Sequence, residues 1–123
     1  MLFRSELKSD DKNIIEQLAY SFLRLGKTTD AVEMFKKEIN LFPDDAWGYY
    51  NIACVFSLGN KTADALEYFK MALDKKMNEL SHWETDSDLN NIRTLPEFKI
   101  LLKKYFSAEE LTKRPDMFVI VKK

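Results

Sequence analysis

The chain has 123 residues, of which 46% are hydrophobic and 32% are charged, a mixture typical of one globular domain and unlike a disordered chain. Nineteen basic side chains stand against twenty acidic ones, which argues against the basic surface that nucleic-acid binding requires. The single cysteine excludes an internal disulfide and a cysteine-based zinc site.

The sequence has neither a predicted membrane span nor a predicted secretion signal. No apolar run approaches the roughly 18 residues that are needed to cross a bilayer. Residues 1–11, which we treat as a lead-in, carry charges and lack the apolar stretch of a secretion signal. We therefore expect a cytoplasmic protein with no membrane partner, and a lone cysteine fits such a reducing compartment.

Residues 12–45 have the pattern of two helices joined by a glycine turn. Apolar residues recur at three- and four-residue steps, as one face of a helix requires. Asp11 can cap the start of the first helix, and Gly26 permits the left-handed turn that ends it. Pro43 ends the second helix. The two stripes are Ile15, Leu18, Ala19, Phe22 and Leu25, followed by Ala31, Val32, Phe35, Ile39 and Phe42.

Residues 46–79 repeat this segment at an offset of thirty-four positions. Ala19 and Phe22 match Ala53 and Phe56, and internal identity at a fixed offset indicates a repeat architecture. Close approach of two helices needs small residues opposite large ones, so we expect these alanines and phenylalanines to pack together. The other identities are Lys27, Thr28, Asp30, Ala31, Glu33, Phe35 and Lys36, which fall on Lys61, Thr62, Asp64, Ala65, Glu67, Phe69 and Lys70.

Residues 12–79 resemble the tetratricopeptide repeat family, whose period is also thirty-four. The first unit departs from the family at Glu38, where a small residue is usual, and the second has Met77 in place of the terminal proline. The resemblance implies an all-α fold, a short right-handed solenoid of antiparallel helix pairs. It is carried by Leu18, Ala19, Phe22, Gly26, Ala31, Phe35 and Pro43, and by Tyr49 to Phe56, Ala65, Phe69 and Ala72.

Residues 80–106 are expected to close the stack, because an open-ended stack leaves an apolar face exposed. Trp83 begins a third unit, after which the repeat pattern breaks. Asp86 or Asp88 can cap a short helix, and Pro96 suits the first turn of another. We place one repeat domain over residues 12–106, with units 12–45 and 46–79 and a degenerate cap.

Residues 107–123 are predicted to form a C-terminal tail that is extended in part. Ser107 can cap a short helical turn, and Pro115 prevents its continuation. Residues 117–121 form a β-prone apolar run, which something should cover. Three interpretations are open: the run folds back onto the domain, contacts a partner or a second copy in a homodimer, or continues into a longer chain.

In this family, partners usually lie along the inner surface formed by the first helix of each unit. Trp47 and Tyr50 are three residues apart on that face, and we expect them to be exposed anchors unless the tail or the N-terminal segment covers them. The partner-binding residues implied by the resemblance are Asn13, Glu16, Tyr20, Arg24, Trp47, Tyr50, Asn51, Cys54 and Leu58.

Two more specific binding functions are disfavoured. Some family members hold a carboxylate-terminated chaperone peptide, but Glu16 would repel it, although Asn51 fits one of the expected places. Asp86, Asp88 and Glu97 mimic the spacing of a calcium loop. Arg93 replaces the apolar anchor of such loops, so we expect no metal.

No catalytic constellation is evident. A triad needs a base and an orienting group together, and His82 is the only histidine. Cys54 is more typical of a small packed residue than of a nucleophile. We therefore expect a non-enzymatic module without a cofactor that binds a protein or peptide in a concave groove. The alternative is a self-associating structural or regulatory domain, either alone or within a larger assembly or enzyme.

Overall fold

The computed structural model describes residues 11–122; residues 1–10 and 123, and with them nearly all of the predicted lead-in, lie outside the described part. Within residues 11–122 the chain forms eight α-helices and no strand, which confirms the all-α prediction. The helices are α1 (Lys12–Arg24), α2 (Thr28–Leu41), α3 (Ala46–Leu58), α4 (Thr62–Asp74), α5 (Leu80–Thr85), α6 (Asn90–Arg93), α7 (Pro96–Tyr105) and α8 (Ala108–Thr112), with two 3-10 turns, η2 (Ser87–Leu89) and η3 (Pro115–Phe118). Across these residues, none of the helices combines the length and apolar character needed to cross a membrane.

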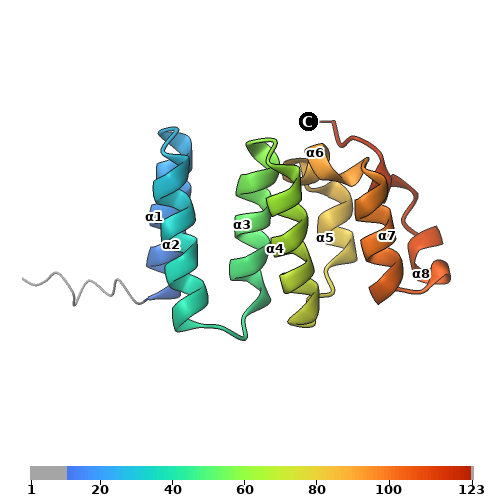
Figure 1. The fold of residues 1–123 in the computed structure, drawn as a ribbon, viewed down its shortest axis with the longest axis horizontal. Helices are drawn as coiled ribbons and strands as arrows, with labels where there is room; N and C mark the ends of the chain where they lie inside the picture. Colours follow the sequence, from blue (N-terminus) through green and yellow to red (C-terminus); the bar gives the residue numbers. More distant parts are fainter. Residues whose placement is uncertain (1–10, 123) are drawn as a thin grey trace, which may run out of the picture.

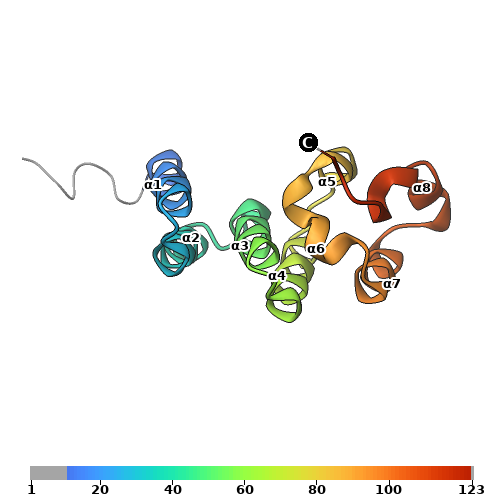
Figure 2. The same cartoon turned by 90° about the horizontal axis from the view of Figure 1, so that it is seen from above.

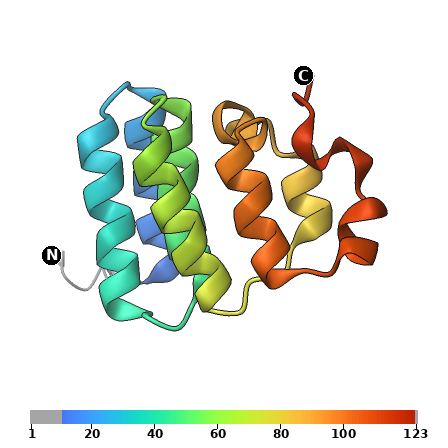
Figure 3. The same ribbon diagram turned by 45° about the vertical axis from the view of Figure 1, so that its right-hand side comes forward.

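The helices lie in two rows. Helices α1, α3 and α5 form one row, and α2, α4 and α7 form the other (Figures 1 and 2). Helix α2 packs against both α1 and α3, and α4 packs against both α3 and α7. Turning the molecule brings α2, α4 and α7 in front of the first row (Figure 3). The short α6 and η2 connect the two rows beyond α5, and both contact α3.

The predicted caps and turns form where the sequence places them. The side chain of Asp11 accepts a hydrogen bond from the backbone N–H of Asn13 at 2.8 Å and so begins α1. Asp45 does the same for α3. Gly26 has a φ of +77°, the left-handed conformation that glycine adopts without strain. In the second unit Asn60 rather than Gly59 takes this role, with a φ of 60°.

The repeat alanines belong to the buried core of the domain. Ala19, Ala31, Ala53 and Ala65 are fully buried. Phe35 and Phe69 are equally buried, whereas the side chains of the two matching phenylalanines, Phe22 and Phe56, are half-buried. Ala53, Ala65 and Phe69 share one hydrophobic cluster, and Ala19 and Phe35 share another, so these residues lie in a common core as the repeat predicts.

Aromatic rings continue this core into the closing segment. The ring of Phe69 lies edge-on to Trp83, with centroids 5.0 Å apart, and 5.2 Å from the ring of Phe98. Phe98 and Trp83 are both fully buried. Residues from the second unit and from the predicted cap therefore share one hydrophobic cluster.

The tail folds back onto the domain, which is one of the three interpretations that the sequence leaves open. Residues 115–118 form η3, and Met117 is fully buried. The side-chain amide of Asn90 pairs with the backbone of Val121, donating to its carbonyl at 2.9 Å and accepting from its N–H at 2.8 Å. The β-prone run makes no strand because these contacts hold its backbone to α6.

Replacing Ala65 by phenylalanine should overpack the contact between α3 and α4. We expect a loss of about 1–3 kcal/mol in the free energy of unfolding, measured by urea denaturation followed by circular dichroism. Ala63→Phe is the matched control, because Ala63 is exposed on the same helix and should change stability by less than about 0.5 kcal/mol. An equal loss in both variants would contradict the packing assigned to Ala65.

Candidate functional site

A groove of about 690 Å³ lies between α1, α3 and the α5–η2 segment. This volume is within the range of ligand-binding clefts. Every partner-binding residue implied by the sequence lines it except Arg24. The lining also includes residues that sequence reasoning did not assign to the groove: Lys12, Leu23, Val55, His82, Thr85, Asp86, Ser87 and Asp88.

Two of the expected residues differ from their predicted roles. Arg24 lies outside the groove lining, and its guanidinium donates to the hydroxyl of Ser21 at 3.2 Å on the exposed surface. Tyr50 is 2% exposed, so it belongs to the groove floor and is not a protruding anchor. Its ring is fixed edge-on against half-buried Trp47, with centroids 5.5 Å apart. Tyr20, which is 43% exposed, is the accessible aromatic residue.

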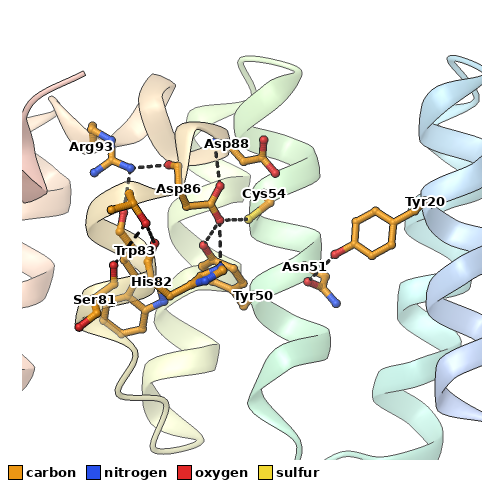
Figure 4. Close-up of polar contacts among 11 residues, drawn as sticks. Tyr20, Tyr50, Asn51, Cys54, Ser81, His82, Trp83, Asp86, Asp88 and Arg93 are labelled. Atoms are coloured by element: carbon orange, nitrogen blue, oxygen red, sulfur yellow. Dashed lines mark hydrogen bonds and ion pairs between the residues drawn. The ribbon is translucent and has the colours of Figure 1, made fainter. Parts of the chain in front are cut away.

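The carboxylate of Asp86 joins the floor of the groove to its end wall (Figure 4). One oxygen accepts a hydrogen bond from the backbone N–H of Asp88 at 3.0 Å, which begins η2. The other accepts from the Tyr50 hydroxyl. The same oxygen lies 3.3 Å from Nε2 of His82 and 4.0 Å from Sγ of Cys54. One side chain therefore links α3, α5 and η2.

Arg93 fixes the backbone that carries Asp86. Its guanidinium is fully buried and donates to the carbonyl oxygens of Asp86 and Trp83, the latter at 2.9 Å. It also donates to the carbonyl of Met117 at 2.7 Å and to the side chain of Asn90 at 2.9 Å. A buried arginine needs such partners, because an unpaired charge in the interior is strongly destabilising. The residue that argued against a calcium loop thus anchors the closing segment and the tail.

A hydrogen bond crosses the groove at its other end. The hydroxyl of Tyr20 on α1 donates to Oδ1 of Asn51 on α3 at 3.2 Å (Figure 4). The Tyr20 ring also lies edge-on to Phe35 at 5.5 Å. Asn51 is buried and forms part of the groove floor. The hydrogen bond from Tyr20 orients its side chain.

Cys54 is not set up as a nucleophile. Burial raises the pKa of its thiol well above the usual range, and the negative charge of Asp86 raises it further. The thiol is therefore protonated near neutral pH, and the thiolate is the reactive form. Cys54, Asp86 and Asp88 have ligand atoms within 4.8 Å of one another, a spacing at which they could hold a metal ion if the thiol lost its proton.

No protein-family model, curated protein or solved structure matches this chain. The tetratricopeptide resemblance therefore stays a prediction from the residues themselves. The candidate site is therefore described from the residues that line the groove.

Glu38, the residue that departs from the repeat pattern, is buried beside the groove. Neither carboxyl oxygen has a hydrogen-bond partner among the described residues. Burial, and then the nearby carboxyl of Glu16, raises the pKa of Glu38 to about 8. Glu38 packs beside Gly48, where a Cβ atom would make an ordinary contact with Cδ of Glu38 at 3.6 Å and a tight one with Cγ1 of Ile39 at 3.1 Å.

The pKa of Glu38 predicts how stability depends on pH. The folded chain holds this proton up to about pH 8, whereas an unfolded carboxyl loses it near its ordinary value of 4.5. Stability should therefore fall as pH rises through this interval, because the folded state binds more protons. Glu38→Gln mimics the neutral acid, so we expect a smaller fall and a more stable protein than wild type at high pH.

Urea denaturation at about pH 5 and about pH 9 measures this difference. Glu97→Gln is the control, since Glu97 is exposed on α7 and should leave the wild-type pH profile intact. A Glu38→Gln profile that is parallel to that of wild type would contradict the raised pKa.

Proposed function

We propose that this chain is a protein-interaction module that binds a peptide or a partner helix in the groove between α1, α3 and α5. The observation that carries the proposal is that one continuous groove is lined by the first helix of each pair and holds eight of the nine residues that the repeat resemblance implies. We further propose that the helix pairs form a short right-handed solenoid of the tetratricopeptide type, closed by residues 80–106.

Binding would be passive recognition by a preformed surface. The floor is rigid, because Tyr50 is held by Asp86, and Asn51 is held by Tyr20. A surface that is ordered before binding loses less conformational entropy when the partner arrives. Trp47 and Tyr20 offer aromatic contact area above this floor, and aromatic residues dominate the energetics of many interfaces. With the Cys54 thiol protonated, we propose binding rather than catalysis.

Removing exposed Tyr20 and half-buried Trp47 should weaken binding while the fold persists. We expect Tyr20→Ala/Trp47→Ala to weaken peptide capture from a displayed random-peptide library by about tenfold or more. Tyr50 is left intact, because its burial makes it part of the fold. Ile100→Ala removes an exposed apolar side chain from α7 and serves as the control. Undiminished capture by a folded double variant would refute the groove assignment.

The alternative function, self-association, is favoured by one observation at the tail. Val119 and Ile120 are 55% and 49% exposed, although Met117 is buried and the backbone of Val121 is bound to Asn90. Adjacent exposed apolar side chains are typical of contact surfaces. A homodimer through these two residues would cover them and leave the groove open.

Light scattering decides this alternative. If the tail mediates a dimer, Val119→Ser/Ile120→Ser should convert it to a monomer, because most of the apolar contact is lost. Leu25→Ser is the control, since Leu25 is exposed at the end of α1, and α1 lies far from the tail (Figure 1). Point substitutions are preferable to truncation, which would remove the buried Met117. A monomeric wild-type protein would exclude self-association.

A further inference from the structure

The groove carries an excess of negative charge although the whole chain is nearly neutral. Glu16, Asp86 and Asp88 contribute carboxylates to its lining. The lining has one lysine, Lys12, and its ammonium group is paired with Asp45 at the edge of the groove. His82, the remaining basic residue, already contacts Asp86. A partner that enters the groove therefore meets carboxylates, with no lysine available to bind an anion.

The pKa values of Tyr20 and Cys54 in the groove are raised chiefly by burial, and the negative charge of the lining contributes in the same direction. Burial raises the pKa of Tyr20 to about 12, and the charges of Glu16 and Asp88 contribute in the same direction. Burial also raises the pKa of Cys54, and Asp86 adds to the shift. Only the part of each shift that comes from Glu16, Asp86 and Asp88 reflects a negative local field, and such a field attracts a cationic group.

The side chain of His82 contacts both the aromatic and the acidic side chains of the groove. Its ring lies edge-on to Trp47 and Tyr50, with centroids 5.3 and 5.6 Å apart, while Nε2 lies 3.3 Å from Asp86. Aromatic rings beside a carboxylate form an environment that suits lysine and arginine, which combine an apolar stem with a charged end. Tyr20 provides a further accessible ring on the opposite wall.

We propose that the partner is a peptide that presents a lysine or arginine side chain to the carboxylates of Glu16, Asp86 and Asp88, with the stem of that side chain against Trp47 and Tyr20. This inference rests on the proposed function and specifies the chemistry of its partner. A peptide that offers a carboxylate at the same place is excluded by repulsion. The concave shape and the aromatic walls select a peptide side chain over a free ion.

Four pools of fluorescein-labelled peptides test the proposal by fluorescence anisotropy. Each pool has random flanking residues and one fixed central residue: arginine, lysine, glutamine or glutamate. We expect the arginine and lysine pools to bind about tenfold more tightly than the glutamine pool, because a charge-assisted contact is added, and the glutamate pool to bind least. Added salt should reduce the difference between the pools.

Charge-removing variants test whether the preference for arginine and lysine comes from the groove. Glu16→Gln/Asp88→Asn should bring the arginine pool close to the glutamine pool, while it leaves the Asp86 network in place. Glu33→Gln/Glu67→Gln is the matched control, because it removes the same charge from exposed positions on α2 and α4. Equal effects of the two double variants would show a long-range field and overturn the assignment to the groove.

The remaining outcomes separate the two proposals. If all pools bind equally and Tyr20→Ala/Trp47→Ala abolishes binding, the groove binds peptides but the preference for a cation is wrong. If no pool binds, both proposals fail. If a zinc titration produces tight binding that depends on Cys54 and the peptides do not bind, the carboxylates serve a metal ion and the peptide proposal is overturned.

Discussion

The position of the Asp86 carboxylate is the constraint on which the groove depends. Its two oxygens contact the Tyr50 hydroxyl on α3, Nε2 of His82 on α5 and the backbone N–H of Asp88 in η2. One residue therefore joins the floor of the groove to its end wall. Arg93 holds the backbone of that residue and also the carbonyl of Met117 in the tail. A buried guanidinium is stable only when its donors are satisfied. The closing segment and the tail therefore complete the site as well as covering the end of the stack.

The shape of the groove follows from how the helix pairs meet. Helix α2 packs against both α1 and α3, so the first helices of the two units are joined through the second row. The space left between α1 and α3 is crossed by the Tyr20–Asn51 hydrogen bond. Alanine and phenylalanine packing sets the distance between helices within a pair. Polar contacts then orient the side chains that line the opening of the groove. The packed apolar residues thus stabilise the fold, and the polar and aromatic residues of the lining can face a partner.

The repeat in the sequence predicts part of this arrangement. An internal period fixes which helical positions recur, so the α1 and α3 contributions to the groove could be inferred, except for Arg24. The end wall could not be inferred from the repeat. Asp86 and His82 reach the groove through contacts with α3, such as the hydrogen bond that Asp86 accepts from Tyr50, 36 residues earlier in the chain. That contact also explains why Tyr50 is buried. The sequence could not decide among the three interpretations of the tail for a similar reason, since local propensity does not reveal that Arg93 binds the Met117 carbonyl.

Whole-chain charge is a poor guide to this protein's partner, because recognition depends on the local field. Nineteen basic and twenty acidic side chains nearly cancel, and that balance favours no particular ligand. The fold then brings three of the acidic side chains together at one groove. Paired lysines such as Lys36 with Lys37 and Lys103 with Lys104 lie on α2 and α7, in the second row, whereas Glu16, Asp86 and Asp88 meet in the groove. Residues that are seventy positions apart thus create a negative surface that no single segment of the sequence contains.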